Sequence, residues 1–232
     1  MVFAHRGGAA LAPENTIAAF DNGVALGSDG VELDVRLSRD GEVVVHHDRT
    51  LERTTTLTGR VADRRADELK RAGVPFLSEV LARYREARII IELKENRSEL
   101  AAAVVRIVRD NEAVDRVCIG SFGLSAVRAV RVLDRAIATS AAREEVRWAL
   151  YRSRCRWPVR RAPYGGYQVP ELAGTTRVVS PRFVRDAHAA GLAIQVWTVD
   201  TEADAERLLE WGVDALITDR PDVIVPIVKS LA

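Results

Sequence analysis

Short apolar runs alternate with amphipathic helical patterns along almost the whole chain. The runs predict strands at residues 2–4, 31–37, 43–45, 87–95, 116–120, 136–139, 167–169, 192–199 and 215–218. Helical periodicity predicts helices at 15–26, 66–72, 78–85, 99–110, 124–133, 143–151, 181–190, 201–211 and 221–231, the third capped by Ser78. This alternation predicts one α/β domain over residues 1–232, and about eight units favour a single-domain (β/α)8 TIM barrel over an open sheet.

The stretch from residue 29 to residue 48 combines a strand pattern with unusual polar residues. Val31, Leu33, Val35 and Leu37 alternate with Glu32, Asp34 and Arg36, so the two carboxylates lie side by side on one face. After a turn at Asp40-Gly41, a second strand leads into His46-His47-Asp48. Carboxylates and imidazoles on consecutive strands indicate a metal site beside an acid/base site. The alternative is an edge hairpin with one solvated face.

Polar residues follow or end most of the predicted strands. They are His5, Arg6, Glu32, Asp34, His47, Glu92, Lys94, Ser121, Trp197 and Asp219. Glu92 and Lys94 are notable because they end an isoleucine run typical of a strand buried on both faces. In a parallel barrel all these strand ends lie on one rim, so we expect an active site at the C-terminal rim of the strands.

Composition and charge narrow the class of protein. The net charge of +1 gives no indication of a nucleic-acid partner. Two distant cysteines, Cys118 and Cys155, lie in no metal spacing and predict reduced thiols. The start MVFAHRGG leaves no room for a signal peptide, and no apolar run is long enough for a transmembrane segment. We therefore expect a soluble, cytoplasmic protein; its oligomeric state is not readable from the sequence.

Several motifs together resemble the glycerophosphodiester phosphodiesterase family. They are AHRGG at 4–8 with APENT at 12–16, VELDV at 31–35, VVVHHDRTLERTT at 43–55, IELK at 91–94, VWTV at 196–199 and ITDRP at 217–221. They occur in the family's order and span nearly the whole chain. One departure lies between Thr55 and Pro75, where this chain looks shorter than many members; this leaves open which alcohol is released.

The resemblance implies a fold of the barrel type and a set of site residues. Glu32, Asp34 and Glu92 would ligate a divalent cation, Mg2+ or Ca2+, in keeping with three oxygen donors and no cysteine ligand. His5 and His47 would be the catalytic acid/base pair, with His47 preferred over His46 because it directly precedes Asp48. Arg6 and Lys94 would contact the phosphate, and Trp197 would line the alcohol pocket. The substrate would be a small glycerophosphodiester, cleaved to sn-glycerol 3-phosphate and an alcohol.

Other interpretations stay open at this point. Trp197 fits barrel packing as well as substrate contact, and Asp219 is interpreted as holding a loop or capping the last helix. The nucleophile is water or a substrate hydroxyl. Rival functions are lysophospholipase D-type hydrolysis of lysophospholipids at the same site, and a non-catalytic barrel that binds a phosphorylated ligand. Seven arginines within residues 143–161, interleaved with aromatics, are interpreted as a solvated face in preference to a peripheral lipid contact.

Overall fold

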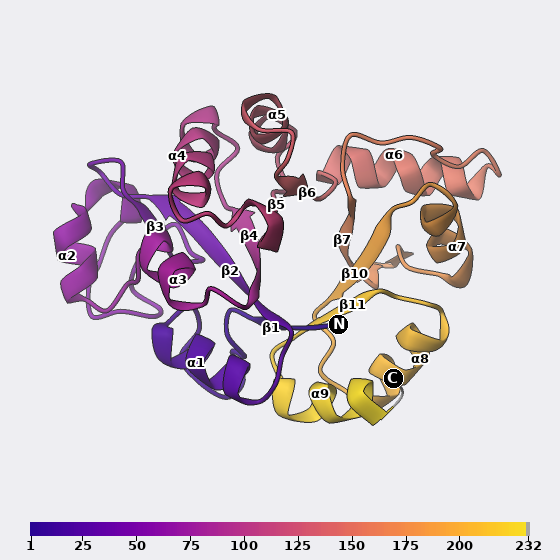
Figure 1. The fold of residues 1–232 in the computed structure, drawn as a ribbon, viewed down its shortest axis with the longest axis horizontal. Helices are drawn as coiled ribbons and strands as arrows, with labels where there is room; N and C mark the ends of the chain where they lie inside the picture. Colours follow the sequence, from indigo (N-terminus) through magenta and orange to yellow (C-terminus); the bar gives the residue numbers. More distant parts are fainter. Residues whose placement is uncertain (231–232) are drawn as a thin grey trace.

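Eight parallel strands form a nearly closed barrel inside a ring of helices in the computed structural model, which describes residues 1–230 (Figure 1). The strands are β1 (Val2–His5), β2 (Gly30–Leu37), β4 (Arg88–Leu93), β5 (Val117–Gly120), β6 (Ala138–Thr139), β7 (Gly166–Pro170), β10 (Ala193–Trp197) and β11 (Ala215–Thr218). Their order around the barrel is β6-β5-β4-β2-β1-β11-β10-β7. A single bridge between Ser140 and Gly166 links the two ends. The predicted barrel is confirmed.

A helix on the outer face follows each barrel strand, and one further short helix, Ala66–Arg71, packs within the segment between residues 43 and 76. The helices are α1 (Ile17–Ala25), α2 (Ala66–Arg71), α3 (Leu77–Arg83), α4 (Ser98–Asp110), α5 (Leu124–Leu133), α6 (Arg143–Arg154), α7 (Pro181–Ala189), α8 (Glu202–Glu210) and α9 (Pro221–Ser230). Two 3-10 turns lie at Val61–Asp63 and Val114–Arg116. Within the described residues, no helix is long and apolar enough to cross a membrane.

The structure corrects two local expectations. Helix α3 starts at Leu77, with Phe76 as its N-terminal flanking residue, so the prediction that Ser78 caps it is wrong. A small hairpin, β8 (Leu172–Ala173) with β9 (Thr176–Arg177), has no counterpart in the sequence-based prediction because two-residue strands leave no periodic pattern. The predicted end of the last helix, Leu231, lies outside the described residues.

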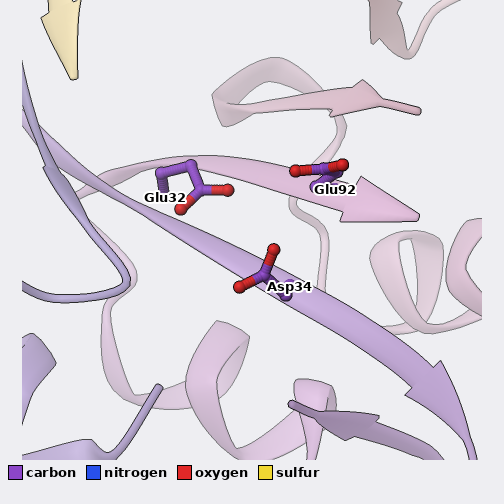
Figure 2. A group of neighbouring side chains, drawn as sticks. All are labelled: Glu32, Asp34 and Glu92. Atoms are coloured by element: carbon purple, nitrogen blue, oxygen red, sulfur yellow. The ribbon is translucent and has the colours of Figure 1, made fainter. Parts of the chain in front are cut away.

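Strand β2 lies inside the sheet, not at an exposed edge. It pairs in parallel with β1 and with β4, and it pairs at its end with the antiparallel strand β3 (Val43–Val45). Glu32 is 5% exposed and Asp34 is 0% exposed, so the interpretation as a hairpin with a solvated face is wrong. Their face is the barrel interior, where Glu92 of β4 joins them (Figure 2). Below them the interior is closed by Phe3, Ile90, Ala215 and Ile217.

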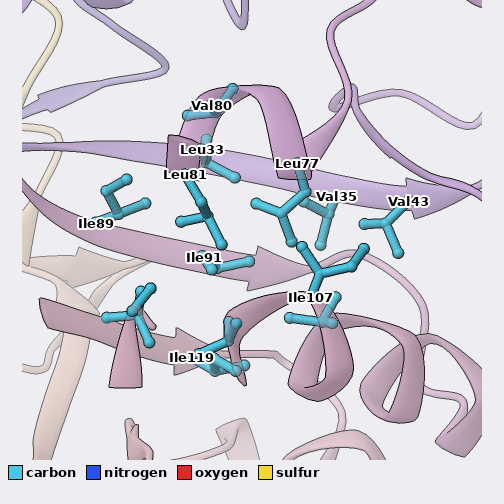
Figure 3. Close-up of a cluster of buried hydrophobic side chains, with 14 of the residues drawn as sticks. Leu33, Val35, Val43, Leu77, Val80, Leu81, Ile89, Ile91, Ile107 and Ile119 are labelled. Carbon is cyan, nitrogen blue, oxygen red and sulfur yellow. The ribbon is translucent and has the colours of Figure 1, made fainter. Parts of the chain in front are cut away.

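The opposite face of the same strands forms the main core. Leu33 and Val35 of β2, Ile91 of β4 and Ile119 of β5 pack against the buried faces of α3 and α4 (Figure 3). The strict period of two therefore separates charge inside the barrel from apolar packing outside it. The rigid outer core fixes the strand backbones, which in turn fixes where the interior carboxylates converge.

Candidate active site

Three carboxylates converge at the C-terminal end of the barrel interior. Glu32 and Asp34 come from β2, and Glu92 comes from β4, opposite Asp34 in the strand register. One carboxylate oxygen from each lies within 4.8 Å of the other two (Figure 2). The alternation of β2 puts the first two on one face, and the parallel pairing with β4 adds the third. Such a group of oxygen donors suits a hard divalent cation.

Two basic side chains lie against this acidic group without satisfying it fully. Lys94 Nζ lies 3.2 Å from Asp34 Oδ1 and 3.3 Å from Glu92 Oε1, and Arg6 Nε lies 3.2 Å from Asp34 Oδ2. Asp34 Oδ1 and Glu92 Oε1 are buried and have no hydrogen-bond donor in suitable geometry. Buried carboxylate oxygens without donors are costly, and a bound cation would remove that cost. The residues therefore fit a divalent cation.

The electrostatics of the three carboxylates differ. Burial, with the neighbouring charges of Asp34 and Glu92, raises the pKa of Glu32 from 4.5 to about 8. Burial also raises the pKa of Glu92, although Lys94 partly opposes it. For Asp34 burial alone would raise the pKa, but Lys94 and Arg6 outweigh it and lower the pKa. Without a cation, Glu32 and Glu92 thus hold a proton more readily than Asp34 does.

His5, at the end of β1, is oriented by a carboxylate from the far end of the chain. Its Nδ1 lies 2.7 Å from Asp219 Oδ1, which follows β11, and its Nε2 lies 3.8 Å from Glu32 Oε2. Burial alone would lower the pKa of His5, but Glu32 and Asp219 outweigh it, so the pKa is raised. The interpretation of Asp219 as only a loop or cap residue is therefore incomplete: its side chain holds His5.

His47 has its own carboxylate partner. Its Nδ1 lies 2.6 Å from Asp48 Oδ1, and Asp48 is in turn held by Arg53. Burial lowers the pKa of His47, and Asp34 and Asp48 offset this only in part. The preceding His46 is 4% exposed and directs Nε2 to Thr50 O at 3.0 Å, away from the cavity. The structure thus distinguishes the two adjacent histidines by their environment.

The loop after β1 turns sharply to place Arg6. Arg6 has φ +51 and Gly7 has φ +90. A Cβ on Gly7 would lie 2.6 Å from the backbone of Ala19 on α1, so only glycine fits this close approach. Arg6 Nη1 donates to Glu14 at 2.9 Å, and Glu14 also accepts from Arg53, which links the Arg6 side of the site to Asp48.

These groups share one large cavity of about 920 Å³ at the barrel mouth. Seven of the eight side chains that the sequence analysis assigned to the site line it: His5, Arg6, Glu32, His47, Glu92, Lys94 and Trp197. Asp34 lies fully buried next to Arg6 and Lys94. Trp197 both packs on the apolar floor of the barrel and lines the cavity, so its two interpretations are compatible.

Three contacts of the site were not foreseen from the sequence. Asp219 contacts His5, Asp48 contacts His47, and Asn15 donates to Asp34 Oδ2 at 2.8 Å from a left-handed backbone position. Asn15 and Asp48 do lie within the recognised motifs, which was the available signal. Asp219 also lies within one of these motifs, ITDRP at 217–221, and at a strand end, but neither signal identified its partner, which lies 214 residues away in the chain.

Comparison with known proteins gives a consistent result. Residues 5–223 match the model of the glycerophosphoryl diester phosphodiesterase family. A relative from Caldanaerobacter subterraneus subsp. tengcongensis, described as a glycerophosphodiester phosphodiesterase, is 31% identical over 248 residues, covering 99% of this chain and 98% of that protein.

Solved structures with the same fold include two that share more than a quarter of their residues with this chain. A phosphodiesterase from Oleispira antarctica, in complex with the product sn-glycerol 3-phosphate, superposes with a TM-score of 0.82 and 28% identity, covering 99% of this chain and 96% of that one. A glycerophosphodiester phosphodiesterase from Agrobacterium tumefaciens superposes with a TM-score of 0.78 and 27% identity, covering 96% and 97%.

Proposed function

Because the chain belongs to the glycerophosphoryl diester phosphodiesterase family, we propose that it hydrolyses glycerophosphodiesters to sn-glycerol 3-phosphate and an alcohol. One observation carries the proposal: two imidazoles, each bonded to its own carboxylate, face a cavity that also holds three convergent carboxylates. We assign the reaction to residues 1–232 as one catalytic domain. The family relationship and the product bound to the Oleispira protein support the substrate class.

Glu32, Asp34 and Glu92 would hold a divalent cation, Mg2+ or Ca2+. When bound, such a cation neutralises phosphate charge and stabilises the charge that develops in the transition state. The chain's own contribution is a set of three carboxylates held in place by strand pairing, two of which have buried oxygens that lack a hydrogen-bond donor.

His5 and His47 are proposed as the acid/base pair. Nδ1 of each ring is engaged by an aspartate, which leaves Nε2 as the atom available for proton transfer. The pKa of His5 is raised and that of His47 is lowered, so the two rings differ in their affinity for a proton. Such a separation suits one group that gives a proton and one that takes it. Water, or a hydroxyl of the substrate, attacks phosphorus and gives its proton to one ring, while the bond from phosphorus to the leaving alcohol breaks and the other ring protonates the released alkoxide. Attack by a substrate hydroxyl forms a cyclic phosphate, which water then opens.

Arg6 and Lys94 are proposed to contact the phosphate oxygens. Both line the cavity next to the carboxylates, and both side chains are largely buried, at 18% and 12% exposed. Desolvated cations interact strongly with a phosphodiester because little water screens them. Trp197 is proposed to line the pocket for the alcohol or glycerol moiety.

Hydrolysis of lysophospholipids is a second candidate, favoured by one side of the cavity. Val146 and Leu150 of α6, Leu172 of β8 and Val178 line the cavity there, together with Arg147 and Arg154. These apolar side chains would accept a longer hydrocarbon group than a deacylated substrate carries.

The proposed function is tested by measuring glycerol 3-phosphate release from glycerophosphocholine with Mg2+ or Ca2+, and again with EDTA. We expect release that needs the cation. Lysophospholipids are tested in parallel. Failure to release product from either class with either cation would overturn the proposal and favour a barrel that only binds a phosphorylated ligand.

Cation affinity is expected to depend on pH through Glu32. Because its pKa is about 8 in the cation-free protein, a cation must displace a proton below that pH. The apparent affinity should therefore weaken up to about tenfold per pH unit between pH 8 and pH 6, and level off above pH 8. By the same linkage, the free energy of unfolding of the cation-free protein should fall as pH rises from 4.5 toward 8, since only the unfolded chain then releases this proton.

Calorimetric titration of Mg2+ and Ca2+ into EDTA-treated protein at pH 6, 7, 8 and 9 measures this slope. Glu32→Gln serves as the matched control, because it should bind more weakly and with a flatter pH dependence. An equal slope in both proteins would contradict the role of Glu32.

Asp219 is expected to act as a positioning residue for His5. Asp219→Asn keeps a hydrogen-bonding oxygen but removes the charge that helps to raise the pKa of His5. We expect kcat/KM to fall by about tenfold or more, and the limb of its pH profile that belongs to His5 to move to lower pH. Asp222→Asn, at the start of α9, is the control, because it alters a surface pair with the preceding Arg220. An unchanged pH profile in Asp219→Asn would contradict this role.

A further inference from the structure

A row of exposed aromatic side chains lies on α6 and the segment after it. Trp148 is 57% exposed, Tyr151 is 60% exposed and Trp157 is 67% exposed. Trp148 and Tyr151 stack with ring centroids 5.8 Å apart, and the Arg152 guanidinium lies 4.5 Å from the Trp157 ring centroid. Water-exposed aromatics held in a fixed arrangement are unusual on a surface without a partner. We call residues 143–161 the aromatic–arginine surface.

This surface also concentrates the positive charge of the molecule. Residues 143–161 contain seven arginines and two glutamates, a net charge of +5, whereas the whole chain has +1, which leaves −4 for the rest. Among residues 1–230, none of these seven arginines forms an ion pair with a carboxylate. One of the two glutamates, Glu145, is already paired with Arg131 at 2.7 Å. The charge is therefore available to an anionic partner.

The active-site cavity reaches this surface. The same cavity that His5 and His47 line is bounded on its α6 side by Arg147, Leu150, Tyr151 and Arg154. Leu172 of the β8–β9 hairpin is 50% exposed and lines the cavity as well. Helix α6 lies next to α7 in the ring, beside strand β7 (Figure 1). A partner bound to the aromatic–arginine surface would thus lie beside the opening of the active-site cavity.

We propose that the aromatic–arginine surface docks on an anionic lipid bilayer and places the cavity mouth at the lipid surface. Arginine guanidiniums bind lipid phosphates in a bidentate way, and tryptophan and tyrosine rings settle at the level of the head groups. Each basic residue near an anionic bilayer strengthens binding, and interfacial aromatics add apolar burial. The apolar side chains at the cavity edge favour a lipid over a nucleic acid. The proposal does not depend on catalysis, because it concerns binding alone.

The test is cosedimentation of the full chain with vesicles at low ionic strength. One set is phosphatidylcholine alone, and the other contains about one-third phosphatidylglycerol. We expect at least about tenfold tighter binding to the anionic set, with loss of that preference as salt is raised, and a shift of tryptophan fluorescence to shorter wavelength on binding. Equal binding to both sets, or binding to neither, would overturn the proposal.

Variants locate the contact. Arg156→Glu with Arg160→Glu should weaken binding to anionic vesicles at least about tenfold, and Trp148→Ser with Trp157→Ser should abolish the fluorescence shift. None of these four side chains lines the cavity, so glycerophosphocholine release, where present, reports that the variants are folded. Arg85→Glu with Arg106→Glu makes the same charge change at exposed positions near α3 and on α4 and should bind like the unaltered protein. Equal losses in both arginine pairs, or preferential binding of a single-stranded oligonucleotide, would refute a lipid-docking surface.

Discussion

Replacing His47 with alanine is expected to lower kcat/KM for glycerophosphocholine by about 10²- to 10⁴-fold. The ring lines the cavity with its Nδ1 fixed by Asp48 at 2.6 Å, so its removal leaves the reaction without one of two proton-transfer groups. Substrate binding should change little, because Arg6 and Lys94 remain. The loss should therefore appear mainly in kcat rather than in KM.

Two comparisons make this result specific. His188→Ala is the control, because His188 is an exposed helix residue that pairs with Asp214 and does not line the cavity. The double variant His5→Ala with His47→Ala should be little worse than either single variant, since groups that act as a unit are not additive. A His47→Ala protein with nearly full activity would contradict the proposed role.

Replacing Asp34 with asparagine is expected to have the second large effect. Asp34 is fully buried, and its carboxylate faces Lys94 at 3.2 Å and Arg6 at 3.2 Å. Asparagine has almost the same shape as aspartate but no charge. The change therefore removes a proposed ligand of the metal cation and leaves the largely buried Lys94 and Arg6 side chains less well neutralised. We expect cation affinity and kcat/KM to fall by about 100-fold or more. The pKa of Asp34 is lowered in the folded protein, so the stability that its charge contributes is present at neutral pH and lost as pH falls.

The same loss of charge is expected to destabilise the protein, because removing one partner of a buried ion pair leaves the other charge buried without compensation. Calorimetric cation titration, the midpoint of thermal unfolding and glycerol 3-phosphate release are measured together. Asp63→Asn, at an exposed position in the 3-10 turn after β3, is the control. Unaltered cation binding in a folded Asp34→Asn protein would exclude Asp34 as a ligand.

Local alternation in the sequence was sufficient to predict the order of strands and helices. The period of two in β2 separates Glu32 and Asp34 from Leu33 and Val35 whatever the rest of the chain does, because successive side chains of a strand point to opposite faces. The predicted segments were least accurate where elements are very short, as for β6 and the β8–β9 hairpin, since two residues carry no period.

The sequence also predicted that the site residues meet at the C-terminal rim of the barrel, but it did not predict which side chains contact one another. Placing His5, His47 and Glu92 at strand ends follows from the run of apolar residues before each of them, and a parallel barrel brings such ends together. What the pattern cannot give is the partner of each side chain, because that depends on strand register and barrel closure.

The sequence by itself therefore determined the barrel, the residue types at its mouth and the two faces of each strand, all of which depend on neighbours along the chain. Tertiary structure alone decided that Asp219 holds His5, that Lys94 contacts Asp34 of the neighbouring strand, and that the cavity extends to α6. The physical reason is distance: these contacts join residues far apart in sequence, and only the closed barrel brings their charges within the few ångströms over which they act strongly.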